Sequence, residues 1–459
     1  MIHPVGFSRR AFLRQSAALA AAGACPPWLA ACAGESPSPT NSGRRADGPN
    51  MLYIMADDLG YADTSLYGRS DYHTPVLDGL AREGVRLTHA YSAAPVCSPT
   101  RVGLMTGRYP ARYEAGLQEP LTTHPFGLAP VPKTLPALLR DVGYETALVG
   151  KWHLGLPDDF SPGRHGFDEF FGFRGAANDY VNHRGTETRE HDLWDGDEPV
   201  RREGYLTDLL TDRATQIIRR PRDTALFLSL QYNAPHWPWQ GPGDPAWPDN
   251  LSWRDGGSME TYARMVLSMD EGIGRVLQSL RDAGLENDTL VIFTSDNGGE
   301  QFSDMGALSQ AKMTLWEGGI RVAAFARWPG VIPADSVTDQ VAATFDWTAT
   351  MVAAAGAAAD ASAPFDGVDI LAQLRGEATV ARDLYWRTYQ RTRHKALRSG
   401  DWKYLVTEDG AGLYDLAGDP GESNNLRTRD PATFERLEAQ YARWESEMLE
   451  PVPLEARFA

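Results

Sequence analysis

Four short apolar runs, each ending in polar side chains, constrain the fold of this chain most strongly. Each run is short enough to be a buried strand, and together they cover residues 51–55, 146–149, 225–230 and 290–294. Amphipathic stretches with helical spacing alternate with them, at residues 74–83, 135–140, 205–218 and 259–283. This alternation predicts an α/β fold in which helices cover both faces of a large, mainly parallel or mixed sheet.

Ionisable or amide side chains follow each predicted strand within a few positions. In chain order they are Asp57 and Asp58, Lys151 and His153, Asn233 and His236, and Asp296 and Asn297. Ligands of open α/β sheets bind at the carboxyl ends of the strands. We therefore expect these side chains to share one site.

Four of these residues offer oxygen ligands and predict a metal site. Asp57, Asp58, Asp296 and Asn297 form a set that suits a hard cation. Flexible six- or seven-fold oxygen coordination favours Ca²⁺, with Mg²⁺ as the alternative. Two or more carboxylates in one pocket would repel each other without a cation. A solvated loop would explain Asp57 and Asp58 on their own.

Cys97 is the one cysteine that lies beyond the N-terminal 32 residues. Pro99 suits the first turn of a helix and Gly107 suits its end, so Cys97 falls at a helix N-terminus, where anions are favoured. Arg101 is four residues on and faces the same side of the helix. The pattern predicts an anion site beside a reactive sulfur. An inert buried thiol is the alternative.

Two further positions are candidates for chemistry. Lys151 and His153 are two residues apart, so an extended chain would point both side chains the same way. His236 lies between Pro235 and the Trp237-Pro238 pair, a rigid turn that can hold an imidazole in place. A surface lysine and structurally packed histidines are the alternatives.

These motifs resemble a known family. Residues 97–101, CSPTR, followed by LMTGR at 104–108, are similar to the signature of the type I sulfatases of the alkaline-phosphatase superfamily. Matches to the same family include ADDLG at 56–60, GKWHLG at 150–155, APH at 234–236, SDNGG at 295–299, Lys312 and LYDL at 413–416. Thr100 stands where the family more often has serine; the hydroxyl is kept.

The resemblance implies a sulfuric ester hydrolase whose nucleophile is made from cysteine. A formylglycine-generating enzyme would oxidise Cys97 to formylglycine, and its hydrated gem-diol would attack sulfur with help from Asp296 as base. Calcium would be bound by Asp57, Asp58, the modified Cys97, Asp296 and Asn297. Magnesium is less expected.

The resemblance also implies roles for the remaining candidates. Lys151 and Lys312 would stabilise charge on the sulfate, and the choice of Lys312 depends on the family spacing alone. Arg101 would orient the formylglycine. His236 would protonate the leaving alcohol, and His153 would deprotonate the second hydroxyl so that sulfate is expelled.

Two other functions fit parts of the pattern. One is a phosphonate monoester or phosphodiester hydrolase of the same superfamily, and the other is an unmodified, lipid-anchored binder of sulfated glycans. A small sulfated substrate, most simply a carbohydrate, is expected, with aryl sulfates as the alternative. The Trp237-Pro238-Trp239 segment could stack on sugar rings or belong to the core.

The N-terminal segment resembles an export signal. SRRAFL at 8–13 is similar to a twin-arginine motif, and LAAC at 29–32 is similar to a lipobox that would lipidate Cys32. We expect an export signal at 1–31, a flexible tether at 32–49, the catalytic domain at 50–374 and a C-terminal subdomain at 375–459. The last would be a small antiparallel sheet and a helix near 431–447. The protein would be periplasmic or on the cell surface.

The negative net charge of the chain limits the kinds of molecule that it is expected to bind. The chain has 44 basic and 61 acidic residues and a formal net charge of -17, so nucleic acid is not expected to bind. After the N-terminal segment no run is apolar for long enough to span a bilayer. Membrane attachment is therefore expected only through the lipid anchor.

Overall fold

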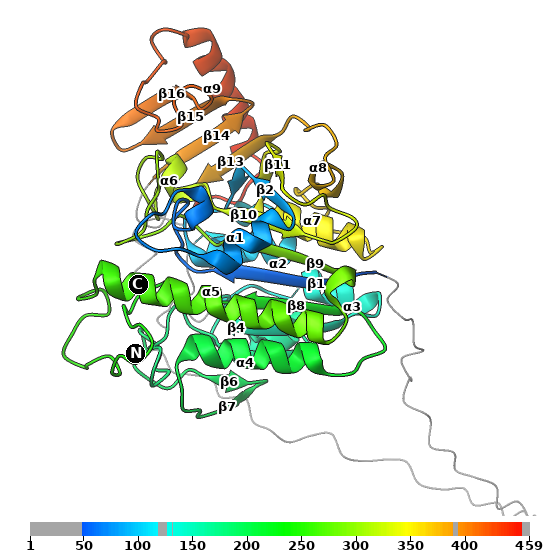
Figure 1. The fold of residues 1–459 in the computed structure, drawn as a ribbon. Helices are drawn as coiled ribbons and strands as arrows, with labels where there is room; N and C mark the ends of the chain where they lie inside the picture. The colour runs from blue at the N-terminus through cyan, green and yellow to red at the C-terminus, as the bar shows by residue number, and fades with distance from the viewer. Residues whose placement is uncertain (1–47, 118–125, 131, 389–392, 452–459) are drawn as a thin grey trace, which may run out of the picture. The chain divides into compact units, whose positions relative to one another are not determined.

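Five parallel strands form the centre of the fold in the computed structural model. They lie side by side in the order β9 (Thr289–Ser295), β1 (Asn50–Ala56), β8 (Leu226–Gln231), β4 (Glu145–Lys151) and β5 (Glu169–Phe173) (Figure 1). The first four contain the four apolar runs of the sequence. The prediction of a large, mainly parallel sheet is confirmed.

The structure describes residues 48–117, 126–130, 132–388 and 393–451, all within one compact unit, Arg44–Ala459. Among these residues the main sheet has 10 strands and is mixed, because β10 pairs antiparallel with β9 and with β2, as do β5 with β6 and β6 with β7. The outer strands are β2 (Val85–Leu87), β6 (Trp194–Asp195), β7 (Glu198–Pro199), β10 (Ala324–Arg327) and β11 (Ser336–Thr338). Strands β3 (Ala90–Tyr91) and β12 (Ala342–Ala343) form a separate parallel pair.

Helices cover both faces of the sheet, as predicted. Leu52 and Ile54 of β1 pack with one set, whereas Met51 and Tyr53 pack with the other, because neighbouring side chains of a strand point to opposite faces. The first set is α1 (Pro75–Arg82), α4 (Leu206–Arg219) and α5 (Met259–Asp282). The second is α2 (Cys97–Thr106), α3 (Leu135–Asp141) and α7 (Thr344–Ala354), and two short helices are α6 (Glu317–Ile320) and α8 (Leu371–Leu374).

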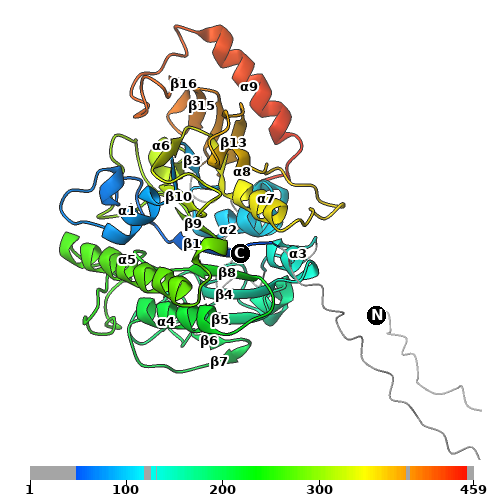
Figure 2. The same cartoon turned by 45° about the vertical axis from the view of Figure 1, so that its right-hand side comes forward.

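The C-terminal region forms the predicted antiparallel sheet. Its strands are β13 (Asp383–Arg387), β14 (Lys395–Ser399), β15 (Trp402–Thr407) and β16 (Gly410–Asp415), with α9 (Pro431–Glu445) packed beside them (Figure 2). Gly400, between β14 and β15, and Gly410, at the start of β16, have φ of 60° and 121°, so the turns there use conformations that glycine permits.

Several predictions about the ends of the chain are not tested by the fold. The export signal, Cys32 and most of the tether lie outside the described residues, and the domain boundaries near residues 50 and 375 stay predictions. Among the described residues, none of the helices combines the length and the hydropathy of a membrane span.

A buried ionic cluster joins the C-terminal sheet to the rest of the protein. Lys403 of β15 lies 2.9 Å from Glu317 of α6 and 2.8 Å from Glu422, and all three side chains are fully buried. Burial alone would raise the pKa of Glu317, but the neighbouring cations, Lys403 first, lower it from 4.5 to about 2. Glu317 is therefore ionised in the folded protein over the whole range in which an unfolded glutamate titrates.

We predict that Glu317 makes the folded state less stable as pH falls from about 4.5 to about 2. A folded-state pKa below the unfolded one gives stability that is present above the unfolded pKa and lost below it. At about 1.4 kcal/mol per pKa unit, the loss is on the order of 3 kcal/mol. Urea unfolding of wild type and Glu317→Gln across this range should show the wild-type advantage shrinking, and parallel curves would contradict the assignment. Glu422 does not add to this window, because burial raises its pKa to about 7.

Candidate active site

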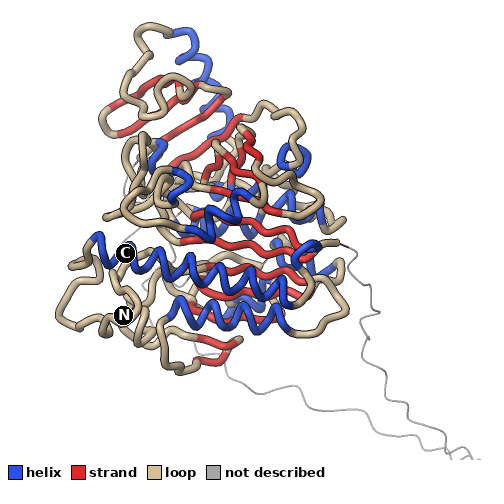
Figure 3. The backbone as a smooth tube through the Cα atoms, in the orientation of Figure 1, coloured by secondary structure: helices blue, strands red, loops and turns tan. Residues whose placement is uncertain are grey.

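The predicted site residues meet at one edge of the parallel sheet, where long loops gather (left in Figure 3). Register explains why: Ala56 of β1 pairs with Ser295 of β9, and Met55 pairs with Gln231 of β8. Residues 57 and 296 therefore leave the sheet side by side, and the Asp296 N–H donates to the Ala56 carbonyl at 3.1 Å. The structure brings together Cys97, Arg101, Lys151, His153, His236, Lys312, Asp57, Asp58, Asp296 and Asn297, all of them largely buried.

Cys97 is the first residue of α2, so its sulfur lies at a helix N-terminus as predicted. Its Sγ donates to Asp57 Oδ1 at 3.3 Å. Burial, and then the charges of Asp296 and Asp57, raise the pKa of the thiol well above its usual value of 9.0. Unmodified Cys97 is thus held as a neutral thiol, which is a poor nucleophile.

Arg101 ties the strand ends together. One guanidinium nitrogen lies 3.0 Å from Asp296 Oδ2 and 4.0 Å from Asp57 Oδ1. Another donates to the Lys151 carbonyl at 3.2 Å and to Gln231 Oε1 at 3.0 Å. The cation therefore offsets two buried carboxylates and fixes the end of β4 against the end of β8.

Four buried side chains form a candidate metal site, and the two carboxylates among them are ligands that a hard divalent cation prefers. Ligand atoms of Asp57, Asp58, Cys97 and His236 all lie within 4.8 Å of one another. Burial is the main cause that raises the pKa of Asp57 to about 8, and repulsion from Asp296 adds to it; a bound cation would oppose both effects.

Asn297 adds a further oxygen to this donor set. Its Oδ1 is buried and has no hydrogen-bond partner among the described residues, while its Nδ2 donates to Asp58 Oδ1 at 2.7 Å. Asp296 is placed beside them by Arg101 and by the Asp58 N–H, which donates to its Oδ1 at 3.2 Å. Both residues of the predicted Asp-Asn pair therefore contact Asp58, a member of the candidate metal cluster.

Two buried lysines face these carboxylates. Lys151 Nζ donates to Asp57 Oδ2 at 2.6 Å, and Lys312 Nζ donates to Asp58 Oδ2 at 2.8 Å. Burial would lower both pKa values, but the charge of Asp57 raises that of Lys151 and the charge of Asp58 raises that of Lys312. Both amines are thus ammonium groups, and they provide fixed positive charge for an anionic substrate.

The two histidines are held differently. His153 has a φ of 53°, so the expectation of an extended chain from Lys151 is wrong, although its ring still reaches the cluster of charges. Both ring nitrogens of His153 are buried without a partner among the described residues. His236 has Nδ1 2.6 Å from the Trp237 carbonyl and Nε2 3.5 Å from Asp58 Oδ2. Nδ1 of His236 is therefore tied to the backbone, and Nε2 faces the site.

Gln231 was not among the predicted site residues, and Asn233 was expected at the site without a role. Gln231 supplies an acceptor to Arg101, and its Nε2 donates to Ser229 Oγ at 2.7 Å, whereas the Tyr232 hydroxyl points the other way to Thr211. The alternation places Asn233 on the face of Gln231. Neither polar atom of its buried side chain has a partner among the described residues. Ser229, Gln231 and Asn233 are polar residues at alternate positions along and just after the apolar run, and this alternation was the available signal.

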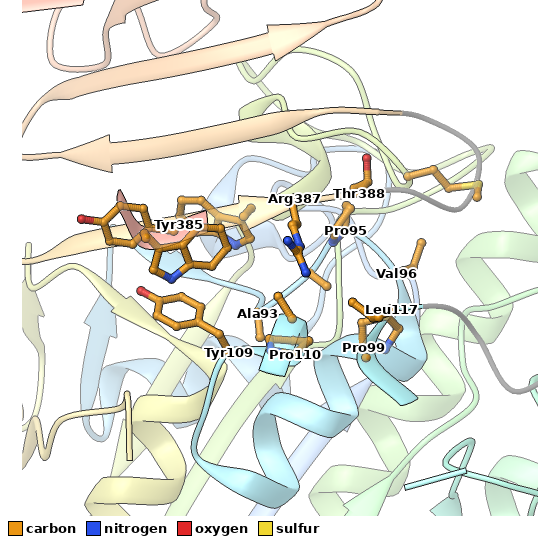
Figure 4. Close-up of a pocket in the computed structure, with 16 residues that line it drawn as sticks. Ala93, Pro95, Val96, Pro99, Tyr109, Pro110, Leu117, Tyr385, Arg387 and Thr388 are labelled. Carbon is orange, nitrogen blue, oxygen red and sulfur yellow. The ribbon is translucent and has the colours of Figure 1, made fainter. Parts of the chain in front are cut away.

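Two features beside the site do not explain substrate binding. The Trp239 ring packs on Tyr262 and Phe302, so this tryptophan belongs to the core. A hollow of about 50 Å³ lies between the start of α2 and the C-terminal sheet, lined by Pro99, Tyr109 and other residues (Figure 4). It is far below the roughly 300 Å³ of ligand pockets, so we do not place the substrate there.

The fold and this site define an alkaline-phosphatase-like α/β hydrolase. The sulfatase family model matches residues 49–357, and the model described as "N-sulphoglucosamine sulphohydrolase, C-terminal" matches residues 310–444. The chain belongs to the sulfatase family of sulfate ester hydrolases.

Named relatives and a solved structure agree with the assignment to the sulfatase family. The chain is 35% identical to arylsulfatase J of Mus musculus over 70% of its own length and 55% of that protein, so it spans about half of this relative. It is 33% identical to N-acetylgalactosamine-6-sulfatase of Sus scrofa over 74% of its own length and 68% of that protein. The structure of Ps i-CgsB in complex with a neocarrahexaose matches with a TM-score of 0.81 and 28% identity, covering 88% of this chain and 94% of the other.

Proposed function

We propose that the chain hydrolyses sulfate monoesters with a formylglycine made from Cys97 and a calcium ion. The observation that carries the proposal is the position of Cys97: it begins α2 and contacts Asp57, among two lysines and two histidines. Because the thiol itself is held neutral, oxidation to an aldehyde gives this position a use that the free cysteine lacks. Thr100 keeps its hydroxyl hydrogen-bonded to the Ala94 carbonyl at 2.9 Å, and we expect modification to proceed.

Asp57, Asp58, Asp296, Asn297 and residue 97 would hold the calcium ion. Their oxygen donors favour calcium over metals that prefer nitrogen or sulfur, and magnesium is the alternative. When bound, the ion would supply Lewis-acid polarisation of sulfate oxygens. Hydrated formylglycine would supply an oxygen nucleophile and a second hydroxyl.

The protein's own cations bind and orient the sulfate. The Lys151 side chain is fully buried and that of Lys312 is 6% exposed, and both are held in place by carboxylates, so their attraction for an anion is stronger than in water and needs no reorganisation. Arg101 keeps Asp296 ionised beside residue 97, where this carboxylate can accept a proton. Burial would raise the pKa of Asp296, but Arg101 and Lys151 lower it below 3.8.

The histidines would move protons at the two ends of the reaction. His236 donates Nδ1–H to the Trp237 carbonyl, so Nε2 faces the site and can give a proton to the leaving oxygen when the ring is doubly protonated. Burial, and then Lys312 and Lys151, lower the pKa of His236 well below 6.5, and the negative charge of a bound sulfate ester would favour the protonated ring that the role requires. His153 has two unpartnered ring nitrogens and a pKa lowered well below 6.5 by burial and by Lys151, so it is present as the neutral base. We assign it to proton removal from residue 97 when sulfate is released.

We predict that His236→Ala slows hydrolysis of alkyl sulfates far more than that of 4-nitrophenyl sulfate. An alkoxide needs the proton and a nitrophenolate does not, so the expected loss of kcat/KM is roughly 10²- to 10⁴-fold for the first substrate and much smaller for the second. His153→Ala is the matched control, because its step is common to both substrates. Equal losses for both substrates in His236→Ala would refute the assignment.

A sulfated carbohydrate is the substrate class we propose. Ps i-CgsB was solved with a neocarrahexaose, and one relative is named for N-acetylgalactosamine 6-sulfate hydrolysis. The test is a panel of sulfated sugars together with 4-nitrophenyl sulfate and an aryl phosphonate. Turnover of sulfate esters in preference to the phosphonate is expected. Preference for the phosphonate would favour the other superfamily activity, and binding without turnover would favour a glycan-binding protein.

We further propose that the protein is exported and anchored through Cys32, in the periplasm or on the cell surface. A twin-arginine route carries folded proteins, so the formylglycine-generating enzyme would act on Cys97 before export. Mass measurement of the cytoplasmic precursor tests the order: an aldehyde at residue 97 is expected, and a thiol confined to the precursor would contradict it.

A further inference from the structure

The loop between β9 and α6 carries Lys312, and backbone hydrogen bonds join its two ends. The Lys312 N–H donates to the Gly299 carbonyl at 3.0 Å, and the Gly298 N–H donates to the Gly319 carbonyl at 3.0 Å. The backbone beside Asn297 is therefore bonded to α6, and the backbone of Lys312 is bonded to the same stretch. The position of α6 thus affects both residues.

The backbone of this loop packs directly against the backbone of α6. A Cβ atom on Gly298 would lie 1.9 Å from the Gly318 carbonyl oxygen, and one on Gly319 would lie 2.1 Å from the Thr314 carbonyl oxygen. Backbone meets backbone at both points, so a displacement of α6 cannot be absorbed by a flexible side chain. It would pass directly to Gly298 and to the neighbouring Asn297.

The start of α6 is fixed by the C-terminal sheet. Glu317 Oε1 accepts from Lys403 Nζ at 2.9 Å, and the Glu317 N–H donates to Glu422 Oε2 at 2.6 Å. Lys403 Nζ lies 2.8 Å from Glu422 Oε1, and the Tyr91 hydroxyl donates to Glu317 Oε2 at 2.7 Å. Arg321 also lies 3.6 Å from Glu317 Oε2. Removing Lys403 therefore takes away one of the two cations that pair with Glu317 and the cation that joins Glu317 to Glu422, and these buried carboxylates can make up the loss only by moving.

We propose that Lys403 and Glu317 are positioning residues, whose ion pair sets the place of Lys312 and Asn297 in the active site. Strand β15 is then part of the framework of the site, although Lys403 pairs with Glu317 and Glu422 and not with the proposed reacting groups. The inference rests on the proposed function only in the role it gives to Lys312.

Lys403→Met tests the proposal, because it keeps the length of the side chain and removes its charge. The matched control is Arg327→Met. Arg327 is also buried, pairs with Glu83 at 2.8 Å and Glu286 at 2.6 Å, and lies beside Val291, away from the active-site end of β9. Both variants should lower the melting temperature, so a shared loss of stability can be separated from a local effect.

The first readout is hydrogen exchange of peptides covering residues 296–319. We expect faster exchange there in Lys403→Met than in Arg327→Met, with restoration in Lys403→Arg. The second readout is a double-mutant cycle on kcat/KM with Lys312→Ala. If Lys403 acts through Lys312, Lys312→Ala should cost several-fold less activity in the Lys403→Met background than in wild type.

Independent effects would overturn the proposal: equal exchange in both single variants, or activity losses that multiply in the double variant. If Lys403→Met does not fold, Glu422→Gln keeps the Lys403–Glu317 pair and weakens the third contact, and the same two readouts apply. Wild-type protein that hydrolyses no sulfate ester would refute the proposed function instead, while the exchange comparison would still decide this inference.

Discussion

Replacing Cys97 with alanine is expected to lower kcat/KM for aryl sulfates by at least about 10³-fold. The proposed nucleophile is an oxygen on the side chain of residue 97 after its oxidation to formylglycine. Cys97 is the free cysteine of the described residues. The side chain is small and buried, so the variant should fold with a melting temperature near that of wild type. Steady-state hydrolysis of 4-nitrophenyl sulfate measures the loss, and activity within a few-fold of wild type would contradict the account.

Cys97→Ser is the informative companion to this variant. A serine hydroxyl can take up the sulfuryl group but, unlike a hydrated aldehyde, it has no second hydroxyl through which sulfate can be expelled. We expect at most one equivalent of nitrophenol per protein molecule and a trapped sulfate ester on the peptide that contains residue 97. Sustained turnover by the serine variant would show that the second hydroxyl is not needed.

Removal of the divalent cation is expected to have the second largest effect. Asp58→Asn deletes a ligand charge and leaves Lys312, now 2.8 Å from Asp58 Oδ2, without its carboxylate partner. Loss of Lewis-acid stabilisation worth several kcal/mol predicts a fall in kcat/KM of roughly 10³-fold, both in this variant and in chelator-treated wild type. Activity and metal content should be measured together on the same samples.

The control for Asp58→Asn is Asp270→Asn. Asp270 is also a buried aspartate, but it accepts hydrogen bonds from the Val76 and Leu77 N–H groups at the start of α1. Its replacement should reduce stability and leave metal content unchanged. For chelated wild type, added Ca²⁺ should restore activity more fully than added Mg²⁺. Full activity in the chelated, metal-free protein would rule out the metal assignment.

Four of the five central strands could be predicted because each is built around a short apolar run, whereas β5 (Glu169–Phe173) was not among the predicted runs. Strands β1, β4, β8 and β9 each contain a predicted run, and the sequence order of polar residues after them already indicates a shared edge. The outer strands β2 and β11 could not be found this way, since Val85–Leu87 and Ser336–Thr338 are each only 3 residues long and show no usable period.

Most residues of the site could be predicted from the sequence, but the backbone geometry and the buried contacts that hold them in place could not. Lys312 was found only through the family resemblance, because a lone lysine in a loop carries no pattern. The φ of 53° at His153 is set by tertiary packing, which a spacing argument does not see. The Lys403–Glu317 pair joins residues 86 positions apart, and nothing local to either residue marks it.

The most direct test of the central claim is the chemical state of residue 97 set against activity. Protein should be made with varying amounts of a formylglycine-generating enzyme, and the fraction of residue 97 converted from thiol to aldehyde measured by mass spectrometry of its peptide. The account predicts that specific activity on a sulfate ester rises in proportion to that fraction and reaches zero when only thiol remains. Equal activity in converted and unconverted protein would contradict it.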